Sequence, residues 1–167
     1  MSLTVVAIGF AVFALLAAPA TGSAYSMVAV VETQTQGPLN CGNVTPGQEG
    51  TQALLGLSEE FAAATTDGAR ANGPQARPLV VIKELDRCSP PLFQALVGRE
   101  RITRVEVRLF DKRGVHFFTI RLENAAVIRI SMLVRQHGLH EEVAFAFQTI
   151  HLIDERTGVS ASHDFGS

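Results

Sequence analysis

The chain lacks tryptophan, has a single tyrosine and carries little charge. Ten of its 167 residues are phenylalanines, and only 18% of all residues are charged. Phenylalanine packs well but offers no hydrogen-bonding group to a sugar or a base edge. The formal net charge of -2 argues against a nucleic-acid-binding protein, which normally shows a clear basic surplus. The length and the 47% share of hydrophobic residues predict one domain with a substantial core.

Charge is absent from the amino-terminal part of the chain, where no charged side chain precedes Glu32. The apolar run over residues 5–18 has the length of a signal-peptide core and is short for a membrane span. Ala20 and Ala24 each end a small-x-Ala pattern that suits cleavage. We therefore predict a signal peptide over residues 1–24, followed by one domain from residue 25 to 167.

The amino terminus leaves three alternatives open for where the protein resides. Cleavage of the signal peptide gives a secreted or periplasmic protein without stable membrane insertion. An uncleaved segment would instead remain as an anchor. A translation start at Met27, immediately before the first strand-like run, would give a cytoplasmic protein with the same fold.

Cysteine is also scarce, since the chain holds only Cys41 and Cys88. In an exported protein these two can pair in a disulfide. The loop closed in this way would stabilise the fold by about 4 kcal/mol in the chain-entropy model. The alternative is two unrelated thiols, one in a loop and the other beside a helix.

Hydrophobic alternation predicts that the domain is mainly β. Strand-like runs cover residues 26–35, 79–86, 102–110, 115–132 and 141–153. Residues 51–64 fit either a helix or a strand, and their position favours a strand. Ser89 as N-cap, Pro90 in the first turn and Gly98 as the stop predict one short helix. The polar ending after residue 155 is predicted to be a loosely held arm.

Several of the predicted strands carry apolar side chains on both faces. In the run 102–110, one face bears valines and a leucine, and the other bears Arg104, Glu106 and Arg108 with apolar ends. In the run 115–132, an apolar face through Leu122 is expected to continue with Ala126, Ile128, Ile130 and Met132. A lone antiparallel sheet with one wet face does not need this pattern. We expect a small antiparallel β-barrel with one short flanking α-helix, which also packs against neighbouring subunits.

The sequence offers little for catalysis. His137, His140, Glu141 and Glu142 resemble half of a metal site, but their spacing is not that of a helical ligand pair. No serine has a nucleophile elbow, and no glycine-rich loop has phosphate-binding spacing. We therefore expect no enzyme activity, no metal and no cofactor. A hydrolase built on the histidine and glutamate cluster stays as an alternative.

A series of motifs follows residue 82 in a fixed order. A strand ends in Lys-x-x-Asp, Ser-Pro-x-Leu-Phe opens a short helix, and a glycine precedes an alternating strand. These positions are Lys83, Asp86, Ser89, Pro90, Leu92, Phe93, Gly98, Val105, Val107 and Leu109. Their order and spacing resemble the Hcp family, the tube protein of type VI secretion systems. The resemblance covers residues 77–165 well and 26–64 loosely.

The resemblance implies a structural, non-catalytic protein that assembles as a hexameric ring with an open lumen. Such rings stack into a tube, a spike protein binds the tip, and in some cases the lumen carries effector proteins. The loop 65–76 would then reach a neighbouring ring. Candidate contact residues are Asp67, Arg70 and Asn72 in this loop, and Arg104, Arg108 and Arg121 on one strand face.

Two alternatives compete with this interpretation. The three arginines are interleaved with Glu106 and Glu123, so they equally fit an ordinary mixed polar face. The same fold would also suit a secreted binding module that presents loops 36–50 and 65–76 to a protein or a glycan. Oligomeric state separates a ring from such a module.

Overall fold

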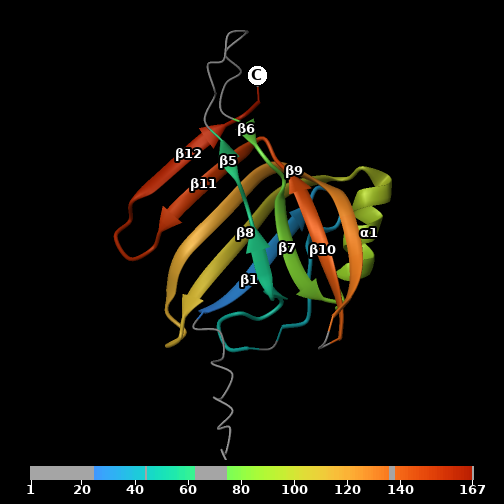
Figure 1. Ribbon diagram of the computed structural model, residues 1–167, viewed down its shortest axis with the longest axis horizontal. Helices are drawn as coiled ribbons and strands as arrows, with labels where there is room; N and C mark the ends of the chain where they lie inside the picture. Colours follow the sequence, from blue (N-terminus) through green and yellow to red (C-terminus); the bar gives the residue numbers. More distant parts are fainter. Residues whose placement is uncertain (1–24, 44, 63–74, 136–137, 167) are drawn as a thin grey trace, which may run out of the picture.

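The computed structural model describes residues 25–43, 45–62, 75–135 and 138–166 (Figure 1). The predicted signal peptide, residues 1–24, lies outside them. The chain forms one helix and a set of strands in this order: β1 (Tyr25–Thr33), β2 (Gly37–Pro38), β3 (Gln52–Leu54), β4 (Gly56–Ser58), β5 (Phe61–Ala62), β6 (Gln75–Ala76), β7 (Leu79–Glu84), α1 (Ser89–Gly98), β8 (Arg101–Asp111), β9 (His116–Arg135), β10 (Gly138–Ala146), β11 (Thr149–Asp154) and β12 (Ser160–Asp164).

Ten of the described strands form a strongly curved antiparallel sheet, and β5 pairs with β6 in a separate two-stranded sheet (Figure 1). The hydrogen-bonded order of the larger sheet is β2-β1-β8-β9-β10-β7-β4. The long strand β9 is central, because its first half pairs with β8 and β11 and its second half pairs with β10. In Figure 1, α1 flanks one side of this sheet, while β11 and β12 form a hairpin on the other side. The mainly β, antiparallel fold with one flanking helix is confirmed.

Two short strands, and not one continuous strand, connect β1 at one side of the sheet to β7 at the other side. The short strand β3 pairs with β1, and β4 pairs with β7. Leu55 lies between them, and its backbone N–H donates to Ile82 O at 2.7 Å. The segment from Gln52 to Ser58 therefore connects the edges of the sheet, as a barrel requires. It also confirms the preference for strand structure in residues 51–64.

The core lies inside this curved sheet and under α1. Cross-strand neighbours such as Val31, Val105 and Leu122 share the inner face and are buried. The helix adds Leu92 and Ala95, which are fully buried. Within the described residues, no helix is both long and apolar enough to cross a membrane.

The helix starts differently from its prediction. Cys88, not Ser89, is the N-cap residue, and it makes no side-chain capping hydrogen bond. Ser89 is the first helical residue instead, and its hydroxyl is engaged elsewhere. At the other end Gly98 is the last helical residue, and Arg99 takes the left-handed conformation with φ of 50°. Its N–H and that of Glu100 bond back to carbonyls of the last turn.

The predicted inner face of β9 is wrong beyond Leu122. Two exposed residues, Glu123 and Asn124, follow in sequence, and Asn124 has φ of 50°. Ala125 is the next buried residue, so the alternation changes phase there. A register shift opposite β10 changes it again, which leaves Ile128 exposed.

The carboxy-terminal part also departs from expectation. The run predicted as a single strand breaks at Phe147 and Gln148 into β10 and β11, which pair with different halves of β9. The tail, predicted to be a loose arm, forms β12 along β11. Phe165 holds it down, because its ring packs edge-on against Phe147 with centroids 5.8 Å apart.

Candidate assembly surface and disulfide-tied helix

The three candidate arginines lie together on the outer face of β8 and β9. Register pairs Arg104 with Glu123, Glu106 with Arg121 and Arg108 with Thr119. Cross-strand partners point to the same side of a sheet, so these side chains form one surface. We call the set Arg104, Glu106, Arg108 and Arg121, with Glu32 from β1, the charged face.

Ion pairs within the chain already engage each arginine of the charged face, although Nε of Arg104 is buried without a hydrogen-bond partner among the described residues. Arg104 contacts Glu32 at 2.7 Å. Glu106 accepts from Arg108 at 2.7 Å through one oxygen and from Arg121 at 3.0 Å through the other. Two arginines thus share one carboxylate across neighbouring strands, which fixes their guanidinium planes.

Glu106 sits at the centre of this arrangement and is only 5% exposed. Burial by itself would raise the pKa of its carboxyl group. The hydrogen bonds and positive charges of Arg108 and Arg121 outweigh burial, so the pKa stays below its usual value. The charged face therefore sets three arginines against two carboxylates in internal ion pairs, and it is not a patch of one sign.

Large apolar side chains are exposed elsewhere on the surface. On α1, Phe93 and Val97 are one helical turn apart and both point to solvent. At the far end of β9, Met132 is 63% exposed and Val134 is 87% exposed. Leu139 on β10 lies opposite Val134 in register and is also exposed. We call Met132, Val134 and Leu139 the apolar tip.

The loop candidates Asp67, Arg70 and Asn72 lie outside the described residues. The three arginines are brought together on one face, as the alternation indicated. Whether they contact another subunit stays a prediction.

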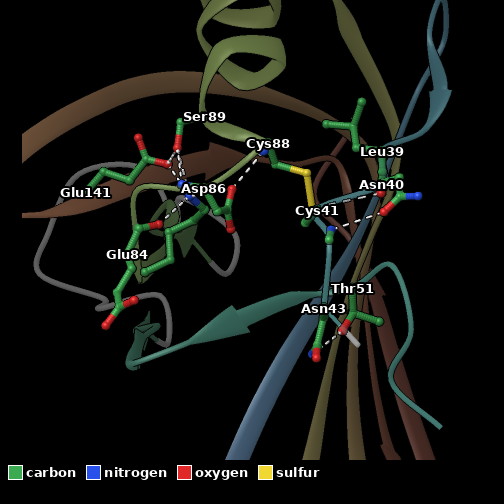
Figure 2. Close-up of a disulfide and its surroundings, with 12 residues drawn as sticks. Leu39, Asn40, Cys41, Asn43, Thr51, Glu84, Asp86, Cys88, Ser89 and Glu141 are labelled. Carbon is green, nitrogen blue, oxygen red and sulfur yellow. Dashed lines mark hydrogen bonds and ion pairs between the residues drawn. A yellow bond between two sulfur atoms is a disulfide. The ribbon is translucent and has the colours of Figure 1, made fainter. Parts of the chain in front are cut away.

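A disulfide joins Cys41 to Cys88 at the start of α1 (Figure 2). The two Cα atoms are 4.9 Å apart, and the residues are 47 positions apart in sequence. Both cysteines are buried in the core cluster. The loop before β3 is thereby fixed to the amino-terminal end of the helix.

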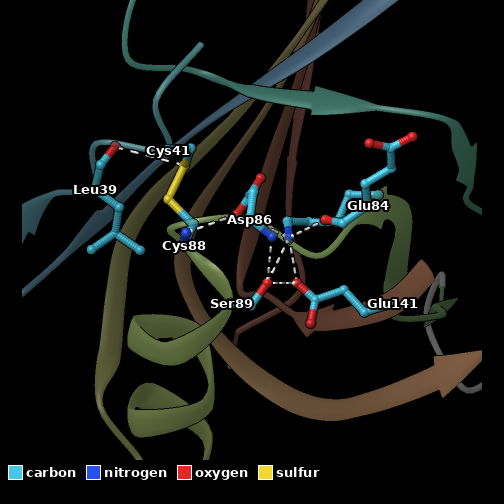
Figure 3. Close-up of polar contacts among 8 residues, drawn as sticks. Leu39, Cys41, Glu84, Asp86, Cys88, Ser89 and Glu141 are labelled. Carbon is cyan, nitrogen blue, oxygen red and sulfur yellow. Dashed lines mark hydrogen bonds and ion pairs between the residues drawn. A yellow bond between two sulfur atoms is a disulfide. The ribbon is translucent and has the colours of Figure 1, made fainter. Parts of the chain in front are cut away.

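A second set of polar contacts lies beside the same helix start, where Asp86, Ser89 and Glu141 come together (Figure 3). Lys83 is fully buried, and its Nζ forms an ion pair with Glu141, which is also buried. Nζ lies 2.7 Å from Glu84 O, 3.1 Å from Ser89 Oγ and 3.1 Å from Asp86 Oδ1. The ammonium therefore meets oxygen atoms from β7, α1 and β10.

Ser89 and Asp86 complete this network, which we call the lysine cluster together with Lys83 and Glu141. Ser89 Oγ donates to Glu141 Oε1 at 2.7 Å and accepts from the Asp86 N–H at 3.0 Å. Asp86 Oδ1 accepts from the Cys88 N–H at 2.7 Å. The cluster thus fixes the turn between β7 and α1, immediately beside the disulfide.

The lysine cluster resembles a Ser–Lys pair only superficially. Lys83 is enclosed by acceptors, and its proton donors are all engaged. Glu141, considered above as a metal ligand or hydrolytic residue, is used in this ion pair. His140 lies opposite Glu84 in register, one position from Glu141 on the alternating strand, and His137 lies outside the described residues. No group of three or more candidate metal ligands occurs in the described ranges.

Sequence reasoning missed the pairing of Lys83 with Glu141. The sequence did contain a signal, because Lys83 lies on the same face of its strand as Leu79 and Val81, which are apolar and buried. A lysine in that position is buried and needs a partner. The carboxylate that pairs with Lys83 belongs to Glu141, 58 residues further along the chain, so strand pairing decides which residue it is.

Comparison with known proteins agrees with this structure. A family model described as "Type VI secretion system effector, Hcp" matches residues 51–152. The chain is 31% identical over 103 residues to the "Major exported protein" of Pseudomonas aeruginosa. That alignment covers 54% of this chain and 60% of the relative, so the chain spans about three fifths of its length.

Solved structures share the fold over most of the chain. "Secreted protein Hcp3" from Pseudomonas aeruginosa superposes with a TM-score of 0.73 at 25% identity, covering 86% of this chain and all of that one (100%). The Hcp1 protein of E. coli EAEC 042 gives 0.77 at 18% identity, covering 83% and 98%. The resemblance seen in the sequence is thereby confirmed. Because the family model spans more than half of its residues, the protein belongs to the Hcp family.

Proposed function

We propose that the protein is a structural subunit that forms a hexameric ring and that its rings stack into a tube. The observation that carries the proposal is the exposed apolar tip on a fold of the Hcp family. A Val134 side chain that is 87% exposed beside Met132 and Leu139 leaves apolar surface that another subunit can bury. Six copies related by rotation close such a heterologous contact into a ring.

The charged face has a different place in this proposal. Its arginines are held in ion pairs within the subunit, so it suits a wetted wall or a polar rim better than an apolar contact. Arg104, Arg108 and Arg121 are proposed to face the lumen or the border of a neighbouring subunit. The loop 65–76, with Asp67, Arg70 and Asn72, is proposed to reach the next ring.

The proposed partners follow from the family, whose members are type VI secretion tube components. They are further copies of the chain, a spike protein at the tip of the tube and effector cargo in the lumen. The role is non-catalytic, because family members serve as structural parts of the tube.

We further propose that residues 1–24 are a signal peptide that is cleaved on export. The relative from Pseudomonas aeruginosa is named an exported protein. The Cys41–Cys88 disulfide supports an oxidising compartment, because disulfides seldom persist in the cytosol. Amino-terminal sequencing of the protein from its host distinguishes cleavage from a start at Met27.

Multi-angle light scattering and negative-stain electron microscopy test the ring. The mature chain, residues 25–167, is expected to elute as a hexamer and to appear as annular particles. Val134→Asp is expected to shift this species to monomers, because a carboxylate in an apolar contact is costly. Val159→Asp, at another exposed valine, serves as the matched control.

A monomer at every accessible concentration would contradict the ring and favour the secreted binding module. Residues 36–50 are then the surface to test, by shortening the loop and measuring partner binding. Rings that survive Val134→Asp unchanged would show that the apolar tip is not the contact.

A further inference from the structure

Residues 40–50, apart from residue 44, are described by the structure. Their hydrogen bonds stay within this segment and its immediate neighbours. Cys41 N–H donates to Gly50 O at 2.8 Å, and Gly50 N–H donates to Asn43 O at 2.8 Å. Asn43 Nδ2 donates to Thr51 Oγ1 at 3.0 Å. The remaining bonds of the segment also end between residues 39 and 51. The disulfide is thus the one directed bond in the described part that ties this segment to the rest of the molecule.

The segment is costly to order without that bond. Gly42, Gly47 and Gly50 all take left-handed φ values between 72° and 82°. Glycine loses more conformational freedom on ordering than any other residue. A disulfide that closes a long loop removes much of that freedom in advance.

The segment leads directly into the strands that bridge the sheet. The strands β3 and β4 have three residues each, and they alone pair with β1 and β7 at this position among the described strands. Gln52 in β3 is fully buried, and neither of its amide atoms has a hydrogen-bond partner among the described residues. The bridge holds Leu54 in the hydrophobic core, but it is short and buries an amide without a partner, so its position also depends on the segment that precedes it.

We propose that the Cys41–Cys88 disulfide gates assembly, so that the oxidised chain forms rings at a much lower concentration than the reduced chain. The proposal rests on the ring-forming function above. In the reduced chain, residues 40–50 detach and the bridge through β3 and β4 loosens. Glu84 lines the same cavity as Cys41 and pairs in register with His140, the neighbour of Leu139 in the apolar tip. Loosening therefore reaches the region beside the proposed contact, and association has to order that region again, which weakens it.

Oxidation is chemically straightforward in the folded chain. Cys41 lines an open cavity of about 330 Å³ together with Gly42, Leu55 and Asp86, whereas Cys88 is 1% exposed. In the reduced chain, where residues 40–50 are loosened, a disulfide oxidant reaches Cys41 from this side and forms a mixed disulfide with it, releasing one thiol. The Cys88 thiolate then attacks Cys41 Sγ and expels the second thiol, so that two protons and two electrons leave the protein.

Comparison of the oxidised and reduced mature chain tests the gate, with oxidised glutathione as the oxidant. Oxidised protein is expected to form rings. The C41S/C88S variant and protein reduced by a phosphine are expected to need at least about tenfold more protein for half-assembly, measured by light scattering. Thr45→Ala keeps the disulfide in the same segment and is expected to assemble like the wild type.

Hydrogen exchange separates a local effect from unfolding. In reduced wild-type protein, residues 40–58 are expected to exchange faster while β8 and β9 stay protected. Assembly of C41S/C88S or reduced protein at wild-type concentrations would overturn the gate, as would unchanged exchange in residues 40–58 or lost protection everywhere. An oxidised wild type that never assembles would instead contradict the ring-forming function.

Discussion

At the scale of single residues, the most consequential side chain is the buried ammonium of Lys83. It joins β7, α1 and β10 through oxygen atoms on each. Buried ion pairs seldom add net stability over apolar residues, because both charges must leave water. Their strong effect appears when one partner is removed and the other stays buried without a counter-charge.

Lys83→Met is accordingly expected to lower the free energy of unfolding by about 3–5 kcal/mol, since it leaves Glu141 buried and unpaired. Chemical denaturation followed by circular dichroism measures the change. The double variant K83M/E141L should recover most of the loss, because no charge is then left in the core. A double variant as unstable as Lys83→Met would show that packing, not charge, explains the loss.

The sequence predicted some of the residues of this site but not the ion pair between Lys83 and Glu141. The order of Lys83, Asp86 and Ser89 was visible, and the cluster uses all three. Ser89 was predicted as an N-cap because it precedes two prolines, yet its hydroxyl serves Glu141 and the Asp86 N–H instead. Local sequence indicates a polar group at a helix start, but only tertiary pairing decides its partner.

At the scale of elements, strand existence was more predictable than strand phase. The alternation in residues 102–110 and the turn at residues 111–114 correspond to β8 and the connection to β9. The predicted alternation of β9 is wrong from Asn124 onward, because this residue takes the left-handed conformation. Asparagine adopts that conformation more readily than most residues, but its presence alone does not predict it. An irregularity of this kind is set by barrel curvature and leaves no clear trace in hydropathy.

The connection after α1 carries a pH-sensitive contact. Glu100 accepts from the Thr35 N–H at 2.8 Å and from Gln36 Nε2 at 3.0 Å, which ties the end of β1 to the start of β8. The Gln36 amide first, and then the Thr33 hydroxyl, lower the pKa of Glu100 from 4.5 to about 2. Because the folded-state pKa is depressed, this carboxylate stabilises the fold above about pH 4.5 and loses that effect as the pH falls through about 2.

Glu100→Ala is therefore expected to be less stable than the wild type at pH 6 and to approach it near pH 2. The group is largely exposed, so salt should reduce the difference. Urea denaturation across this pH range measures it. A constant difference at all pH values would mean that the carboxylate charge is not the cause.

At the scale of the whole molecule, two surfaces bear on assembly, the charged face with its internal ion pairs and the exposed apolar tip. The net charge of -2 gives little long-range steering between copies. The arginines that an acidic neighbour would need already hold Glu32 and Glu106 within their own subunit. Association of subunits should accordingly be driven by burial of apolar surface rather than by charge pairing.

Salt distinguishes these two driving forces. Raising sodium chloride from 0.1 M to 1 M shortens the screening length from about 10 Å to about 3 Å, which weakens exposed charge contacts. Rings held by Met132, Val134 and Leu139 are expected to persist at 1 M salt, and sodium sulfate should strengthen them. Light scattering at fixed protein concentration follows the change. Dissociation of wild-type rings into monomers at high salt, with Val134→Asp behaving like the wild type, would place the contact on the charged face.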